Sequence, residues 1–176
     1  MEKLGKMKIY SILIENKNFF YSPINYEDFF SISSGNYNLV DNIGADFKRI
    51  INSDSFLGDF TWCDNSSILL LKKTLTEELL FKNIKYLPLK NDSEYYIICP
   101  NCIDCLDLKK SKISYFKNSK KIMSIDKYVF REKLISDNEL FFKIKLLNYS
   151  PIFCNDKFVD FYKKNKLTGL VFKRIF

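Results

Sequence analysis

The chain ends with the sequence PIFCNDKFVDFYKKNKLTGLVFKRIF, which runs from residue 151 to residue 176. Residues 151–154 and 170–176 are mostly apolar, with β-branched and aromatic side chains that predict two strands. Between them, Asn155 is a preferred N-cap, and Gly169 suits the left-handed end of a helix. The apolar face of this helix recurs at helical spacing and consists of Phe158, Val159, Phe161 and Tyr162. The stretch therefore predicts a strand, a helix and a strand at the C-terminus.

The rest of the chain contains more strand-like than helix-like segments. Strands are expected at residues 8–15, 18–21, 37–40, 60–63, 84–89, 94–99, 113–116, 122–130 and 140–147. Helices are expected around Tyr26, Phe29 and Phe30, for a turn or two over residues 45–51, and along Leu71, Leu75, Leu79 and Leu80 up to Asn83. Because strands and helices do not alternate strictly, we expect an α+β fold, mainly antiparallel sheet with a few helices.

The length and composition fit one globular domain. A chain of 176 residues has the usual size of a single domain, so we expect one domain over residues 1–176. Aromatic residues make up 16% of the sequence, which predicts a core rich in rings. The patterns are less clear in residues 1–64 than in residues 65–176.

The N-terminal residues and the cysteines indicate a cytoplasmic protein. Residues 1–6 lack the apolar region of a signal peptide, and no apolar stretch approaches the roughly 20 residues of a membrane span. The five cysteines are then expected to be reduced thiols. We therefore expect no membrane contact.

Charge is distributed unevenly along the sequence. Residues 1–64 hold six basic and nine acidic side chains, for a net charge of −3, whereas residues 65–176 hold 22 and 12, for +10. A dipolar surface of this kind steers oppositely charged partners.

The absence of histidine restricts the chemistry that the chain can perform. The sequence contains no His, which excludes Ser–His and Cys–His nucleophile pairs and most catalytic zinc sites. The acidic pairs at residues 27–28 and 77–78 are adjacent, and adjacent residues on a helix do not face each other. We therefore expect no enzyme activity, no catalytic residue and no cofactor.

A cysteine run is the first cluster that suggests chemistry. Cys99, Cys102 and Cys105 have a spacing that could hold zinc or form a thiol-redox centre. A structural zinc site needs a fourth ligand, and the second Cys-x-x-Cys of a zinc ribbon is absent. We therefore favour buried thiols without a metal, and a small zinc or redox protein is the alternative.

A basic stretch is the second cluster. Tyr115 and Phe116 lie among nine basic residues, which are Lys109, Lys110, Lys112, Lys117, Lys120, Lys121, Lys127, Arg131 and Lys133. Rings among lysines could bind RNA or single-stranded DNA, so a nucleic-acid-binding module that uses residues 109–133 is an alternative function. We favour a strand pair with lysines on its outer face, because lysine is abundant throughout and the arginine that base recognition prefers is scarce.

Several segments in residues 65–176 resemble immunity protein family eleven of bacterial polymorphic toxin systems. The resemblance rests on Tyr95–Ile98 followed by Ile103–Ser111, on the segment from Leu71 to Leu89, and on the C-terminal stretch with its LTGLVF strand. It implies an immunity protein that binds and neutralises a cognate secreted toxin and so protects the producing cell. The family supplies no catalytic residues, and the sequence identifies no partner-binding residues. The charge asymmetry predicts either an acidic toxin face or contact through the acidic residues 1–64.

Overall fold

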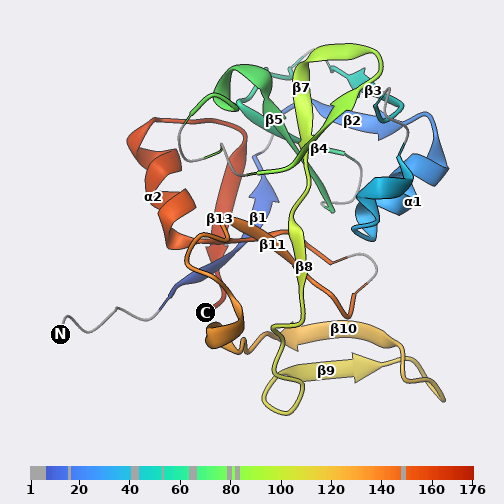
Figure 1. Cartoon of the computed structure of the whole chain (residues 1–176), viewed down its shortest axis with the longest axis vertical. Coiled ribbons are helices and arrows are strands. Elements are labelled where there is room, and N and C mark those ends of the chain that lie inside the picture. The colour runs from blue at the N-terminus through green and yellow to red at the C-terminus, as the bar shows by residue number, and fades with distance from the viewer. Residues whose placement is uncertain are drawn as a thin grey trace.

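The computed structural model describes residues 7–15, 17–40, 44–52, 54–63, 67–78, 81, 84–147 and 150–176. Within these residues the chain forms thirteen strands and two α-helices, which confirms the α+β class. The strands form two larger sheets and one two-stranded sheet (Figure 1). No helix in the described part is long and apolar enough to cross a membrane.

The six-stranded sheet has the strand order β3-β2-β4-β5-β7-β6. Its strands are β2 (Phe20–Pro23), β3 (Phe47–Ile50), β4 (Phe60–Cys63), β5 (Ile68–Lys72), β6 (Tyr86–Leu89) and β7 (Asp92–Ile98). All neighbours are antiparallel except β2 and β4. The helix α1 (Tyr26–Ser33) begins at the N-cap Asn25, and its buried Phe29 and Ile32 pack against this sheet.

The five-stranded sheet joins the two ends of the chain, in the order β13-β1-β12-β11-β8. Its strands are β1 (Ile9–Ile14), β8 (Asn101–Ile103), β11 (Phe141–Ile144), β12 (Phe153–Asn155) and β13 (Leu170–Arg174). The N-terminal β1 pairs antiparallel with both β12 and β13, whereas β8 and β11 are parallel. The remaining strands, β9 (Lys112–Tyr115) and β10 (Ile122–Lys127), form a hairpin at one end of the molecule (Figure 1).

A ring-rich core connects the two larger sheets, as the aromatic composition predicted. Phe158 lies at its centre, fully buried, on α2 (Asp156–Lys164). Its ring centroid is 5.5 Å from that of Phe60 on β4 and 4.4 Å from that of Phe141 on β11. Residues from both sheets therefore share one apolar cluster.

The strand, helix and strand predicted at the C-terminus are confirmed, with one difference at the helix end. The Asn155 side chain accepts a hydrogen bond from the Phe158 amide at 3.1 Å, as expected of an N-cap. The helix ends at Lys164, however, and the left-handed residue just after it is Lys166, with φ 53°. Gly169 also has positive φ, 104°, but it lies against the Phe60 carbonyl of β4, where a side chain would collide.

Three sequence predictions were wrong, and tertiary pairing explains two of them. Residues 45–51 contain strand β3 instead of a helix, because this segment pairs with β2. The helix expected from Leu71 is also wrong: residues 71–72 end strand β5, whose residues 68–71 are all buried between β4 and β7, and a 3-10 turn follows at Lys73–Leu75. A short run buried on both faces lacks the alternation of a strand. The third wrong prediction is the strand at residues 37–40, because this segment forms a 3-10 helix, Tyr37–Leu39. Leu79, Leu80 and Asn83, also assigned to the expected helix, lie outside the described residues.

Candidate functional site

The cysteine run leaves strand β7 and passes through β8. Cys99 and Cys105 are buried, whereas Cys102 on β8 is exposed, which corrects the expectation that all three are buried. Burial raises the pKa of the Cys99 thiol to about 12 and that of Cys105 to about 11. Thiolates bind metals and act as nucleophiles, so a raised pKa opposes both roles. Among the described residues, no group of three or more His, Cys, Asp or Glu side chains is placed to hold a metal ion.

A buried lysine near this run was not anticipated from the sequence. Lys143 on β11 is 2% exposed, and its Nζ donates to the backbone carbonyls of Ser33 at 2.9 Å and Ile32 at 3.3 Å. These carbonyls belong to the last turn of α1, where a cation is favoured by the helix dipole. Burial lowers the pKa of Lys143 to about 8. The contact fastens α1 to the five-stranded sheet, so its evident role is structural.

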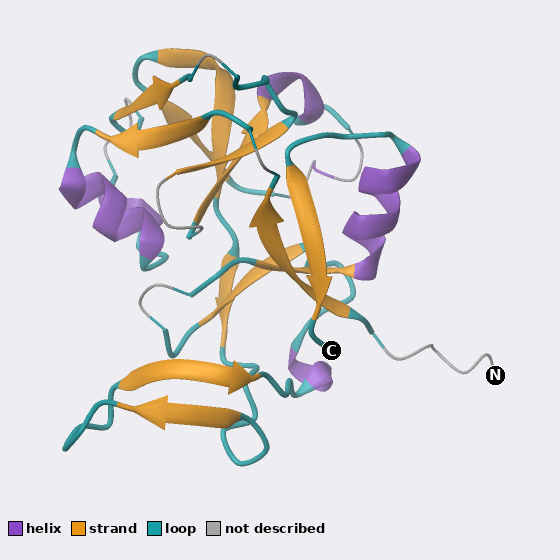
Figure 2. Cartoon of the chain, turned by 180° about the vertical axis from the view of Figure 1, so that it is seen from behind, coloured by secondary structure: helices purple, strands orange, loops and turns teal. Residues whose placement is uncertain are grey.

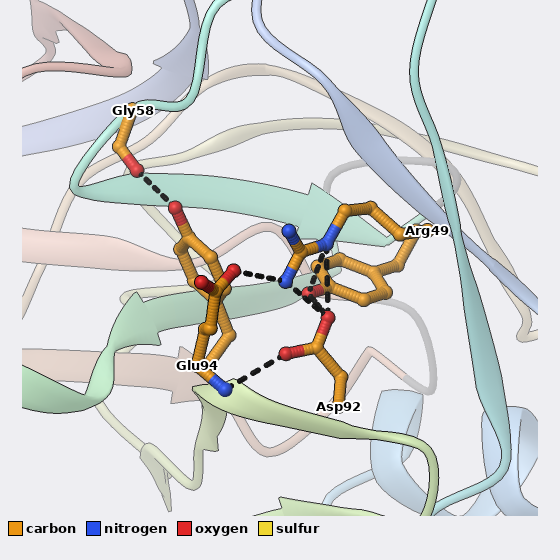
Figure 3. Close-up of polar contacts among 6 residues, drawn as sticks. Arg49, Gly58, Asp92 and Glu94 are labelled. Carbon is orange, nitrogen blue, oxygen red and sulfur yellow. Dashed lines mark hydrogen bonds and ion pairs between the residues drawn. The ribbon is translucent and has the colours of Figure 1, made fainter.

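A partly buried charge cluster lies within the six-stranded sheet (Figure 3). The Arg49 guanidinium donates to Asp92 at 2.9 Å, pairs with Glu94 at 2.7 Å, and lies 5.3 Å from the ring centroid of Tyr95. Burial raises the pKa of Asp92, but hydrogen bonds from Tyr21, the Glu94 amide and Arg49 outweigh it and leave the pKa below its ordinary value. Each charge in this cluster has a partner within the chain, so the cluster fits a role in joining β3 to β7.

The basic stretch forms the hairpin β9–β10, which agrees with the strand pair favoured from the sequence. The sequence did not predict the groove of about 1100 Å³ that lies between the hairpin and the loop after β11. The hairpin contributes Phe116 and Met123 to the groove, and the loop contributes Leu146 and Pro151. Behind the groove, the Tyr128 ring packs at 5.3 Å from Phe153 of the five-stranded sheet. The groove therefore rests on the folded core.

The apolar side chains at the groove are unusually open to solvent. They are between 46% and 56% exposed, and they are Leu108, Tyr115, Phe116, Met123 and Leu146. Single exposed apolar residues are common on proteins, but a group of them around a hollow marks an interaction site.

Two lysines, Lys120 and Lys121, line this apolar surface, and others lie in the same basic stretch. Lys112 pairs with Asp126 at 3.4 Å and Lys110 with Asp107 at 3.7 Å. In the described part of the chain, no ion pair involves four other lysines, which are Lys117, Lys120, Lys121 and Lys127. Lys120 and Lys121 form the basic rim of the groove, which thus combines apolar side chains with unpaired positive charge. The sequence could not reveal it, because Leu146 and Pro151 are about 20 residues from the hairpin in the chain.

Comparison with known proteins points to one family. A family model described as "Immunity protein family (Imm11)" matches residues 87–176, just over half of the chain. The match includes the hairpin, the loop that faces it across the groove, and the C-terminal strand, helix and strand. No curated protein matches the chain.

Proposed function

The chain belongs to the Imm11 immunity protein family, and on this premise we propose that it binds a cognate secreted bacterial toxin and neutralises it, protecting the producing cell. The observation that carries the proposal is the family match, which covers the part of the chain with the exposed groove. A partly apolar hollow on a rigid core suits contact with another protein.

Neutralisation in this proposal requires binding and no reaction. The sequence has no histidine, and the partly buried Arg49 and the buried Lys143 are engaged in contacts within the chain. Occupying the toxin's surface is sufficient to block its substrate. We extend the proposal to the cytoplasm as the place of action, because residues 1–6 lack the apolar region of a signal peptide.

We also propose that residues 1–176 act as one domain. Strand β1, from the N-terminal part, pairs with two strands of the C-terminal part, and one apolar cluster contains residues of both larger sheets. A chain joined in this way is expected to unfold as one unit.

Growth protection tests the proposed function. The toxin domain encoded beside this chain's gene is expressed in a susceptible host, with this chain or with an empty vector. We expect growth only when this chain is present, and a matched immunity protein from an unrelated system should give none. Equal growth arrest with and without this chain would contradict the proposal.

A nucleic-acid-binding module remains the rival function, because the hairpin combines Tyr115 and Phe116 with lysines. That function predicts binding to unrelated oligonucleotides with a steep dependence on salt. The same protein, titrated with a fluorescent single-stranded oligonucleotide at 50 and 200 mM salt, distinguishes the two functions.

A further inference from the structure

We propose that the groove beside β9–β10 is the toxin-binding surface, and that it holds an extended toxin segment carrying acidic side chains next to apolar ones. This inference rests on the proposed function and adds the surface and the chemistry of the partner. Three features of the described residues support it: the exposed apolar lining, the free edge of β10, and the unpaired lysines.

The apolar lining supplies the binding free energy. Phe116, Met123 and Leu146 are each about half exposed, so a partner that covers them removes a large apolar area from water. Met is also adaptable and frequent at protein interfaces. Since Tyr128 fixes the floor of the groove against Phe153, little order has to be gained on binding.

The edge of β10 favours an extended segment. The hairpin sheet contains only two strands among the described residues, so β10 pairs with β9 on one side alone. In Figures 1 and 2, β10 lies between β9 and the larger sheets, so its other edge faces the body of the protein. A strand from a partner can add to such an edge through backbone hydrogen bonds, while alternate side chains enter the hollow.

The charge of the rim selects the partner's sequence. Lys120 and Lys121 line the groove and form no ion pair within the described residues, so a segment with Asp or Glu side chains would meet unneutralised positive charge. Complementary charge of this kind raises the association rate and excludes other partners.

The same residues argue against nucleic acid as the occupant. The arginine of the stretch, Arg131, is paired with Asp104 at 3.0 Å, and this pair would have to open before Arg131 could read bases. The lining contains the rings of Tyr115, Phe116 and Tyr128, but most of its apolar side chains are aliphatic, whereas single strands bind mainly by stacking on rings.

Substitutions in the groove test this inference with the toxin domain encoded beside this chain's gene as the probe. We expect Met123→Asp, and separately Lys120→Glu combined with Lys121→Glu, to weaken binding by roughly tenfold to a hundredfold, the range of hot-spot residues. Phe30→Asp on α1 is the matched control, because Phe30 is 50% exposed but lies on the acidic N-terminal part. Thermal unfolding of each variant verifies that it folds.

The outcomes separate the inference from the function on which it rests. If the unaltered chain binds the toxin domain and the groove variants bind equally well, the inference is wrong and the function stands. Weakening by Phe30→Asp instead would place the contact on α1 and would also overturn the inference. If the unaltered chain does not bind the toxin domain, the proposed function is wrong, and the inference that rests on it is wrong as well. Binding of an oligonucleotide that Lys120→Glu and Lys121→Glu abolish would assign the groove to nucleic acid.

Discussion

Substituting Phe158 with Ala should destabilise the whole molecule and not one sheet alone. The ring is fully buried and contacts rings from both larger sheets, including Phe60 and Phe141. Phe-to-Ala substitutions in a core cost about 3–5 kcal/mol, which is a large fraction of a typical stability of about 5–15 kcal/mol. With a urea slope of roughly 2 kcal/mol per molar, the unfolding midpoint should fall by about 2 M.

The assay is urea unfolding, followed by far-UV circular dichroism and by the fluorescence of the sole tryptophan, Trp62 on β4. Because Trp62 reports on the six-stranded sheet while Phe158 belongs to α2, coincident transitions mean that both sheets unfold together. Phe116→Ala is the control: it removes a half-exposed ring and should change stability by less than about 1 kcal/mol. An unchanged urea midpoint of Trp62 fluorescence, together with a lowered midpoint of the circular dichroism signal, would contradict the prediction that the chain unfolds as one domain.

Three further predictions follow from local contacts. Asn155→Ala should cost about 1 kcal/mol of unfolding free energy, because the helix loses its N-cap; a loss below about 0.3 kcal/mol in urea unfolding would contradict this. Gly169→Ala should cost more than about 1 kcal/mol, since a Cβ at φ 104° would collide with the Phe60 carbonyl, and unchanged thermal stability would disprove the close approach. The third concerns pH: folded Cys99, with its pKa raised to about 12, keeps a proton that the unfolded chain loses above its ordinary pKa of about 8.5. Stability should therefore fall between pH 8.5 and 12, and less steeply in Cys99→Ala; parallel profiles for the two proteins in reducing buffer would be evidence against a buried, protonated thiol.

Replacing the exposed thiol is a test of the zinc and redox alternative. Cys102→Ser should change stability by less than about 0.5 kcal/mol, because the side chain is exposed. Loss of folding together with release of bound zinc, measured by elemental analysis, would restore the metal-site alternative.

The sequence was sufficient to predict those helices and strands whose characteristic residues lie within a few positions of each other. The apolar face through Phe158 and Tyr162, with Asn155 before it, predicted α2 because a helix brings residues three and four apart together. Short strands such as β1 and β7 were recognisable from their β-branched and aromatic content.

Tertiary partners decided the features that the sequence did not reveal. Residues 68–71 form a strand only because β4 and β7 lie on both sides of it. Arg49 and Asp92 are 43 residues apart, and Lys143 is about 110 residues from the α1 carbonyls that it binds. The groove has the same origin, since Met123 and Leu146 come from separate segments. Contacts between residues so far apart in the chain produce no local sequence pattern, so a single sequence does not reveal them.

The most direct test of the proposed function is calorimetric titration of this chain with the purified toxin domain encoded beside its gene, at 150 mM salt. We predict a saturable complex with a fixed stoichiometry and a Kd in the micromolar range or below, which weakens as salt increases because the groove rim is basic. The absence of any binding heat, together with separate elution of the two proteins on size-exclusion chromatography, would contradict the claim that this chain neutralises the toxin by binding it.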